Sequence, residues 1–231
     1  MGNLILLHGW RCDASIWFSV AEQLTQAGYR VIAVDLPGFG KSQLPPESFT
    51  LQDYALTFAQ FSAELELGSS VLIGHSFGAR VAVKVALTKP EKVSSLILVS
   101  SGGWRPGYRL GLQFVAKLVK PIFSLAFLRD LRRKIYQLLG ADDYLAKPEL
   151  KKIFLNIINE DLLAAASAVR QPTLIIWGEK DDTAPIGFAR QLQAQIPSAQ
   201  LRVFPGAGHF VFLDKPQEFI RQVIEFCKEK P

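Results

Sequence analysis

The sequence has neither the cysteine content of a disulfide framework nor a long apolar run. Its 231 residues include two cysteines, Cys12 and Cys227, which stand in unrelated contexts. We interpret both as reduced residues in or near a core, which favours a reducing compartment. The first residues, MGNLILLHGW, lack the basic region and the cleavage site of a signal peptide, and no stretch reaches the roughly 18 apolar residues of a membrane span. We therefore expect a cytoplasmic protein.

The chain also lacks a general excess of one charge, because its positive charge is concentrated in one segment. The net charge is +5, yet residues 103–170 carry 12 Lys and Arg against 6 Asp and Glu, whereas the remainder carries 14 against 15. A hydrophobic content of 49% with 20% charged residues is typical of a globular protein. We expect no nucleic acid partner, and the basic segment needs an explanation of its own.

Six short apolar runs indicate a parallel sheet. They are continuously apolar rather than alternating, which indicates burial on both faces. The runs are Leu4–Leu7, Arg30–Asp35, Ser70–Ile73, Ser95–Ser100, Thr173–Trp177 and Gln200–Phe204. Helical patterns separate them at Ile16–Ala27, Leu51–Leu65, Ala79–Thr88, Ile186–Ile196 and Pro216–Lys228. This alternation predicts a doubly wound α/β fold.

One long stretch interrupts the alternation, and we interpret it as an inserted helical cap. Residues 103–170 have no strand signal; Pro148 is well placed to begin one of the cap helices, and Glu160–Val169 is expected to form the last. The predicted domains are therefore a core of residues 1–102 and 171–231 and a cap of residues 103–170.

Residues 71–80, VLIGHSFGAR, contain the pattern G-x-S-x-G between a predicted strand and a predicted helix. Glycine at Gly74 and Gly78 leaves space for a very tight turn. The turn holds Ser76 at its apex in a strained conformation and directs its side chain above the sheet. Ser76 is therefore the candidate nucleophile, and the alternative is an ordinary turn in which Ser76 caps the helix.

A serine nucleophile needs a base, and the base needs an orienting acid. Of three histidines, His209 lies in a glycine-rich loop after the last predicted strand and is the candidate base. Asp181 and Asp182 follow the preceding strand, and both qualify as the acid. The order Ser, Asp, His along the chain is the order found in α/β-hydrolases.

A site for acyl transfer also needs N–H donors for the oxyanion. Phe77, next to the nucleophile, supplies one backbone N–H, and Trp10, after Gly9 at the end of the first predicted strand, is in the right place to supply the other. We interpret His8 as a structural residue that braces this loop.

Together these segments make the chain resemble the α/β-hydrolase superfamily, and its serine carboxylesterase-like branch in particular. The resemblance rests on LLHGW, DLPGFGKS, GHSFG, WGEKDDTAP and GAGH. It implies Asp181 rather than Asp182 as the acid, because the family places the acid four residues after the Trp of its W-G-x-x-D motif. It also implies a sheet of about six parallel strands that lacks the usual first two. The expected order puts the Arg30 strand at one edge, followed by the strands beginning at Leu4, Ser70, Ser95, Thr173 and Gln200.

The resemblance implies a serine hydrolase that cleaves carboxylic esters of small or medium acyl groups, with no metal and no organic cofactor. Two alternatives remain. The same triad could hydrolyse carbon–carbon bonds, or the fold could serve a non-catalytic binding role. Ala79 and Arg80 follow the second glycine of the elbow, where many relatives have another glycine, and we expect this departure to matter little to the chemistry.

The basic, apolar cap allows three interpretations. It is an ordinary lid over the pocket, a docking surface for an anionic substrate or an acidic carrier, or a segment that contacts a membrane surface. A weaker likeness to pimeloyl-carrier-protein methyl esterases, which also combine an HGW loop with a basic cap, points to the second. The oligomeric state does not follow from the sequence.

Overall fold

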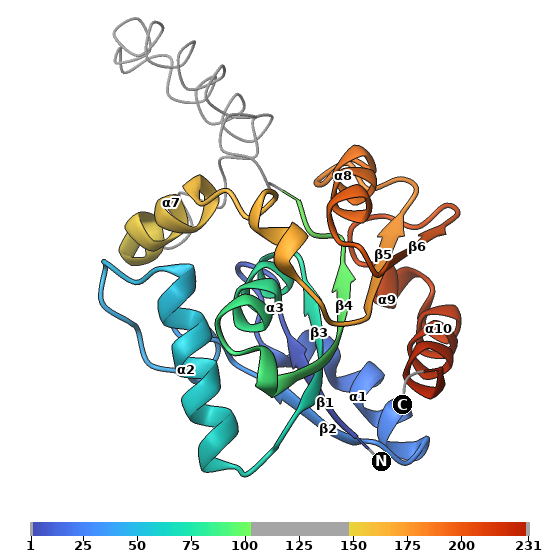
Figure 1. Ribbon diagram of the computed structural model, residues 1–231, viewed down its shortest axis with the longest axis horizontal. Coiled ribbons are helices and arrows are strands. Elements are labelled where there is room, and N and C mark those ends of the chain that lie inside the picture. The colour runs from blue at the N-terminus through green and yellow to red at the C-terminus, as the bar shows by residue number, and fades with distance from the viewer. Residues whose placement is uncertain (1, 103–147, 230–231) are drawn as a thin grey trace, which may run out of the picture.

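A computed structural model describes residues 2–102 and 148–229. Its centre is one sheet of six parallel strands in the order β2-β1-β3-β4-β5-β6 (Figure 1). The strands are β1 (Asn3–Leu7), β2 (Arg30–Val34), β3 (Ser70–His75), β4 (Val93–Val99), β5 (Thr173–Gly178) and β6 (Ala199–Phe204). The predicted fold class and strand order are confirmed, including β2 at one edge. The predicted core and cap domains stay predictions, because most of residues 103–170 lie outside the described part of the chain.

Apolar side chains on both faces explain why these runs form a parallel sheet. Alternate residues of one strand enter different clusters: Ile5 and Leu7 lie in the core beneath α2 and α3, whereas Leu4 and Leu6 lie in the core beneath α1 and α10. The edge strands are less covered, since most of the side chains of β2 and β6 are half-buried or exposed. The four inner strands therefore anchor the loops that follow them most firmly.

Helices cover the two faces of the sheet (Figure 1). The α-helices are α1 (Phe18–Gln26), α2 (Leu51–Glu64), α3 (Phe77–Thr88), α7 (Lys151–Asn159), α8 (Gly187–Gln195), α9 (Val211–Asp214) and α10 (Pro216–Lys228). Short 3-10 helices are η1 (Ala14–Trp17), η2 (Pro90–Lys92), η5 (Pro148–Leu150) and η6 (Ala165–Ala168). No helix among residues 2–102 and 148–229 is both long and apolar enough to cross a bilayer.

The end of the predicted cap differs from the sequence expectation. The segment around Pro148 begins a helix as expected, but Glu160–Val169 is not a continuous helix, because only η6 within it is helical. The carboxylate of Asp161 accepts a hydrogen bond from the backbone N–H of Leu163 at 2.9 Å. This local side-chain bond favours a turn over the helical pairing that the apolar pattern suggested.

Candidate active site

The turn between β3 and α3 holds Ser76 in a strained backbone conformation. Its φ is 52° and its ψ is −110°, a region that side-chain-bearing residues rarely adopt. The N–H of Ser76 donates to the carbonyl of Val99 in β4 at 2.8 Å. Ser76 occupies the N-cap position of α3, but its side chain makes no capping hydrogen bond. The strain orients the hydroxyl without tying it to the helix.

Two glycines make this turn possible. A Cβ on Gly74 would lie 2.5 Å from the backbone of Ala79, and a Cβ on Gly78 would lie 2.3 Å from the carbonyl oxygen of Leu7. Both distances are far below van der Waals contact. The glycines therefore let α3 begin directly against β3 and β1, as predicted for the elbow.

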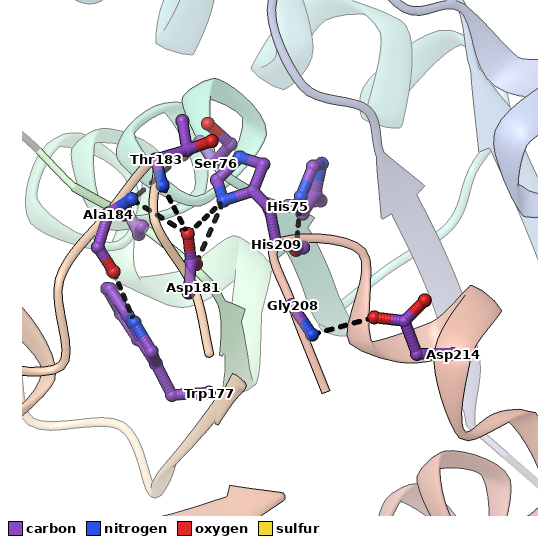
Figure 2. Close-up of polar contacts among 10 residues, drawn as sticks. His75, Ser76, Trp177, Asp181, Thr183, Ala184, Gly208, His209 and Asp214 are labelled. Atoms are coloured by element: carbon purple, nitrogen blue, oxygen red, sulfur yellow. Dashed lines mark hydrogen bonds and ion pairs between the residues drawn. The ribbon is translucent and has the colours of Figure 1, made fainter. Parts of the chain in front are cut away.

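The loops after β5 and β6 bring Asp181 and His209 together. Nδ1 of His209 lies 2.9 Å from Oδ2 and 3.1 Å from Oδ1 of Asp181. The Asp181 side chain is fully buried, while 14% of the His209 side chain is exposed. In Figure 2 the His209 ring lies between Asp181 and Ser76. Asp182 is exposed, so of the two candidate acids the structure brings only Asp181 to the histidine.

The buried carboxylate of Asp181 has partners besides the imidazole. Its Oδ1 accepts hydrogen bonds from the backbone N–H groups of Thr183 at 3.0 Å and Ala184 at 2.8 Å. The carbonyl of Ala184 in turn accepts from the indole N–H of Trp177 at 2.7 Å (Figure 2). Since a buried carboxylate is costly unless it is hydrogen-bonded, these donors stabilise the Asp181 side chain and hold it in one orientation.

The loop that carries His209 is braced at both of its sides. The N–H of Gly208 donates to Oδ2 of Asp214 at 2.7 Å, and Nε2–H of His75 donates to the carbonyl of His209 at 3.1 Å (Figure 2). Gly178 passes so close to this loop that a Cβ there would lie 2.1 Å from the carbonyl of Gly208. These contacts fix the backbone of His209 as well as its ring.

His75 is a second imidazole in contact with the His209 loop. Its ring centroid lies 4.8 Å from that of His209, in an edge-on arrangement, and it packs against the rings of Phe210 and Phe212. Burial, with the neighbouring His209 acting in the same direction, lowers the pKa of His75 to about 3. The ring therefore stays neutral, and its single N–H is used by the carbonyl of His209.

The loop after β1 lies against the nucleophile turn. A Cβ on Gly9 would lie 2.7 Å from Nδ1 of His75 and 3.4 Å from Cβ of Ser76. His8 is buried, and its Nε2 accepts a hydrogen bond from the N–H of Leu36 at 3.0 Å while Nδ1 lies 2.8 Å from the carbonyl of Gly9. The prediction that His8 braces this loop is confirmed.

Trp10 and Phe77, the two expected oxyanion donors, belong to one aromatic cluster. The Trp10 ring lies 5.3 Å from Phe77, 4.9 Å from Phe39 and 5.0 Å from Phe154 of α7. As the first residue of α3, Phe77 has an N–H with no intrahelical acceptor. Phe77 directly follows Ser76 in the chain, so this cluster, which we call the aromatic wall, begins next to the serine. Among residues 2–102 and 148–229, no three His, Cys, Asp or Glu side chains are gathered as metal ligands would be.

A search against known families gives one result over nearly the whole chain. The model of the α/β-hydrolase fold family matches residues 2–216. This chain belongs to that family. The elbow and the loops after β1, β5 and β6 are thus parts of an α/β-hydrolase.

Related hydrolases have different activities. A pimeloyl-[acyl-carrier protein] methyl ester esterase from Nitrosomonas europaea is 31% identical, over 94% of this chain and 92% of the relative. A 2-hydroxy-6-oxononadienedioate/2-hydroxy-6-oxononatrienedioate hydrolase from Burkholderia vietnamiensis is 29% identical, over 97% and 86%. The solved esterase EaEST from Exiguobacterium antarcticum is 25% identical, covers 99% of this chain and 92% of its own, and superposes with a TM-score of 0.79. This α/β-hydrolase therefore has both esterases and other hydrolases among its relatives.

Sequence reasoning missed two residues of this hydrolase. His75 donates a hydrogen bond to the histidine loop, and nothing in the sequence indicated that contact. Arg80 was noted only as part of a departure from the family pattern, yet it is buried and its guanidinium donates to the carbonyls of Ile157 and Glu160. For Arg80 a signal existed, since an arginine in an apolar helix one turn after the nucleophile needs a buried partner.

Proposed function

We propose that this chain is a carboxylic ester hydrolase that works through an acyl-enzyme on Ser76. The observation that carries the proposal is the convergence of a strained serine, a histidine and a buried carboxylate at one end of the sheet. The relatives named as esterases support the same reaction class.

In the proposed reaction, Oγ of Ser76 attacks the ester carbonyl while Nε2 of His209 takes the hydroxyl proton. The tetrahedral intermediate collapses, and His209 returns that proton to the departing alcohol. Water then gives a proton to His209 and attacks the acyl carbonyl. When this second tetrahedral intermediate collapses, the bond to Oγ breaks, His209 returns the proton to Ser76, and the acid is released.

Asp181 and the two backbone donors would act on charge that develops during these steps. Asp181 accepts from Nδ1 of His209 and so leaves Nε2 free to take the serine proton, and its carboxylate stabilises the imidazolium. The N–H groups of Trp10 and Phe77 would hold the oxyanion, with each donor worth about 2.7–4 kcal/mol in the transition state.

The aromatic wall beside Ser76 supports a small or medium acyl group as the substrate. Phe77 and Phe154 are buried and Trp10 is half-buried, so an acyl chain that packs there would remove apolar area from water, at about 25 cal/mol per Å². A carbon–carbon bond hydrolase is the second candidate, and the dienedioate hydrolase relative is the observation that favours it. The same triad would serve both reactions.

A series of p-nitrophenyl esters from acetate to octanoate tests the proposal. We expect turnover by the native protein, covalent labelling of Ser76 by a fluorophosphonate, and loss of both in Ser76→Ala. Full activity in Ser76→Ala would overturn the nucleophile assignment. Turnover of a dienone acid but no ester would favour the carbon–carbon reaction, and labelling without turnover of either would point to a binding protein on this fold.

We further propose that the basic segment, residues 103–170, recruits an anionic substrate or an acidic carrier. The charge count of that segment motivates the proposal, and the relative that acts on a carrier-linked ester agrees with it. Activity toward an acidic carrier-linked ester should fall steeply with added salt, because exposed charges are screened over about 10 Å at 0.1 M. An equal salt response for a neutral p-nitrophenyl ester would contradict it, and co-sedimentation with liposomes would indicate membrane contact instead.

A further inference from the structure

Arg80 is a charged residue inside the core, one helical turn after the proposed nucleophile. Only 4% of its surface is exposed. A buried guanidinium is costly unless hydrogen bonds replace its water, so its partners indicate what it does. Burial lowers its pKa to about 10, against the opposing influence of Glu160 and Asp161, which leaves it charged at neutral pH.

The partners of Arg80 lie at the C-terminal end of α7. Its Nη2 donates to the carbonyl of Ile157 at 2.6 Å and to the carbonyl of Glu160 at 2.7 Å. Glu160 is the residue that follows α7 as its C-cap. The last carbonyls of a helix have no intrahelical donor and carry the negative end of the helix dipole, so a buried cation satisfies both their hydrogen bonding and their charge.

A second contact from α3 reaches the same point. One turn beyond Arg80, Nζ of Lys84 lies 2.8 Å from Oε1 of Glu160. Both of these side chains are partly exposed, so their ion pair is screened by solvent and contributes much less than the buried bonds. Arg80 therefore dominates the connection between α3 and α7.

The anchored helix carries a residue of the aromatic wall. Phe154 is buried, and its ring lies 5.0 Å from that of Trp10, which itself lies 5.3 Å from Phe77. Ile153 and Ile157 bury the same helix against the core. α7 is only nine residues long, too short to be stable without tertiary contacts. The position of Phe154 thus depends on what holds the ends of α7.

We propose that Arg80 is a positioning residue that clamps the C-terminal end of α7 to the nucleophile helix and thereby places Phe154 as the wall of the acyl site beside Trp10. This inference rests on the proposed function for its substrate, an acyl group that packs against that wall. The consequence is selectivity for acyl length: a loosened α7 weakens the binding of long chains, while the triad, held by β3, β5 and β6, still processes short ones.

The test compares Arg80→Met, which keeps the apolar part of the side chain and removes the donors, with Lys84→Met as a matched control. For Arg80→Met we expect kcat/KM for p-nitrophenyl octanoate to fall at least 10-fold, mainly through KM, and kcat for the acetate to stay within 3-fold. Lys84→Met should change both by less than 3-fold. An unchanged chain-length profile in folded Arg80→Met overturns the proposal.

Hydrogen exchange tests the clamp without any substrate. Amides of α7 should exchange at least 10-fold faster in Arg80→Met than in the native protein, while those of β3 and β4 stay protected; equal protection of α7 overturns the clamp even if no ester is turned over. Conversely, faster exchange in Arg80→Met, with no turnover or labelling by the native protein, refutes the proposed function but not the contact between Arg80 and α7.

If Arg80→Met does not fold, Arg80→Lys takes its place, because it keeps the buried charge but has a single donor nitrogen. We then expect the same changes at smaller size, and native exchange and selectivity in Arg80→Lys overturn the proposal.

Discussion

The strained backbone of Ser76 allows a direct measurement of what the nucleophile turn costs in stability. With φ at 52° and ψ at −110°, a residue that has a Cβ loses about 1–3 kcal/mol relative to a relaxed conformation. Glycine avoids this cost, but it adds about 0.4–1 kcal/mol of chain entropy to the unfolded state, which opposes the gain. The strain is the larger of the two effects, so Ser76→Gly should be more stable than Ser76→Ala by about 1 kcal/mol.

Comparing the two variants with each other isolates the strain, because both lack the hydroxyl. Ser76 forms no cap hydrogen bond with its side chain, so neither substitution removes one from the helix. Urea denaturation should give a higher midpoint for Ser76→Gly at unchanged slope, and the melting temperature should rise by about 2–4 °C for a chain of this length. Both variants should fail to react with a fluorophosphonate. If Ser76→Gly unfolds at or below the midpoint of Ser76→Ala, the turn stores no strain and this reasoning is wrong.

Three further predictions follow from the contacts of the site. Asp181→Asn should lower kcat by about 10³–10⁴-fold through loss of the imidazole orientation, whereas Asp182→Asn should stay near native; equal losses in the ester assay would contradict the choice of acid. Gly9→Ala should lower kcat by about 10²–10³-fold with little change in KM, because its Cβ would meet the His75 ring at 2.7 Å and displace the Trp10 N–H. The pKa of His75 in the folded protein, about 3, lies below the usual 6.5, so the unfolded chain binds a proton first as the pH falls. The free energy of unfolding should therefore fall by up to roughly 1.4 kcal/mol per pH unit between pH 6.5 and pH 5. Urea midpoints should show a shallower fall in His75→Phe over that range, and an unaltered slope would argue against a neutral His75.

The sheet was predictable because its signals are local. Runs such as Leu4–Leu7 are apolar at every position. A short run of this kind indicates a strand that is buried on both faces, as in a parallel sheet. The strand order followed from the family's pattern once the elbow was placed, and the structure reproduces it. The tight turn at Ser76 was predictable for the same reason, since Gly74 and Gly78 have a steric meaning that can be read from the sequence.

Contacts between distant segments were harder to predict. Arg80 donates to two carbonyls that are 77 and 80 residues away. Every residue has a backbone carbonyl, so the sequence does not indicate which of them will accept a hydrogen bond. The same holds for His75, whose acceptor is the carbonyl of His209, 134 residues away. Asp181 and Asp182 were separable by the family's spacing alone; the physical reason is that only the former turns inward, where the N–H groups of Thr183 and Ala184 receive its carboxylate.

The two histidines beside the serine show how the surroundings of a side chain, rather than its distance along the chain, decide its chemistry. His75 is adjacent to Ser76 in sequence, but it is buried among Phe210 and Phe212, donates to a carbonyl rather than to a carboxylate, and remains neutral. His209 is partly exposed, and its Nδ1 lies 2.9 Å from the buried carboxylate of Asp181. The two ring centroids lie 4.8 Å apart, and the neutral His75 adds no positive charge beside His209. In the proposed reaction the two imidazoles therefore have different roles: His209 accepts the serine proton, and His75 donates a hydrogen bond that holds the loop of His209.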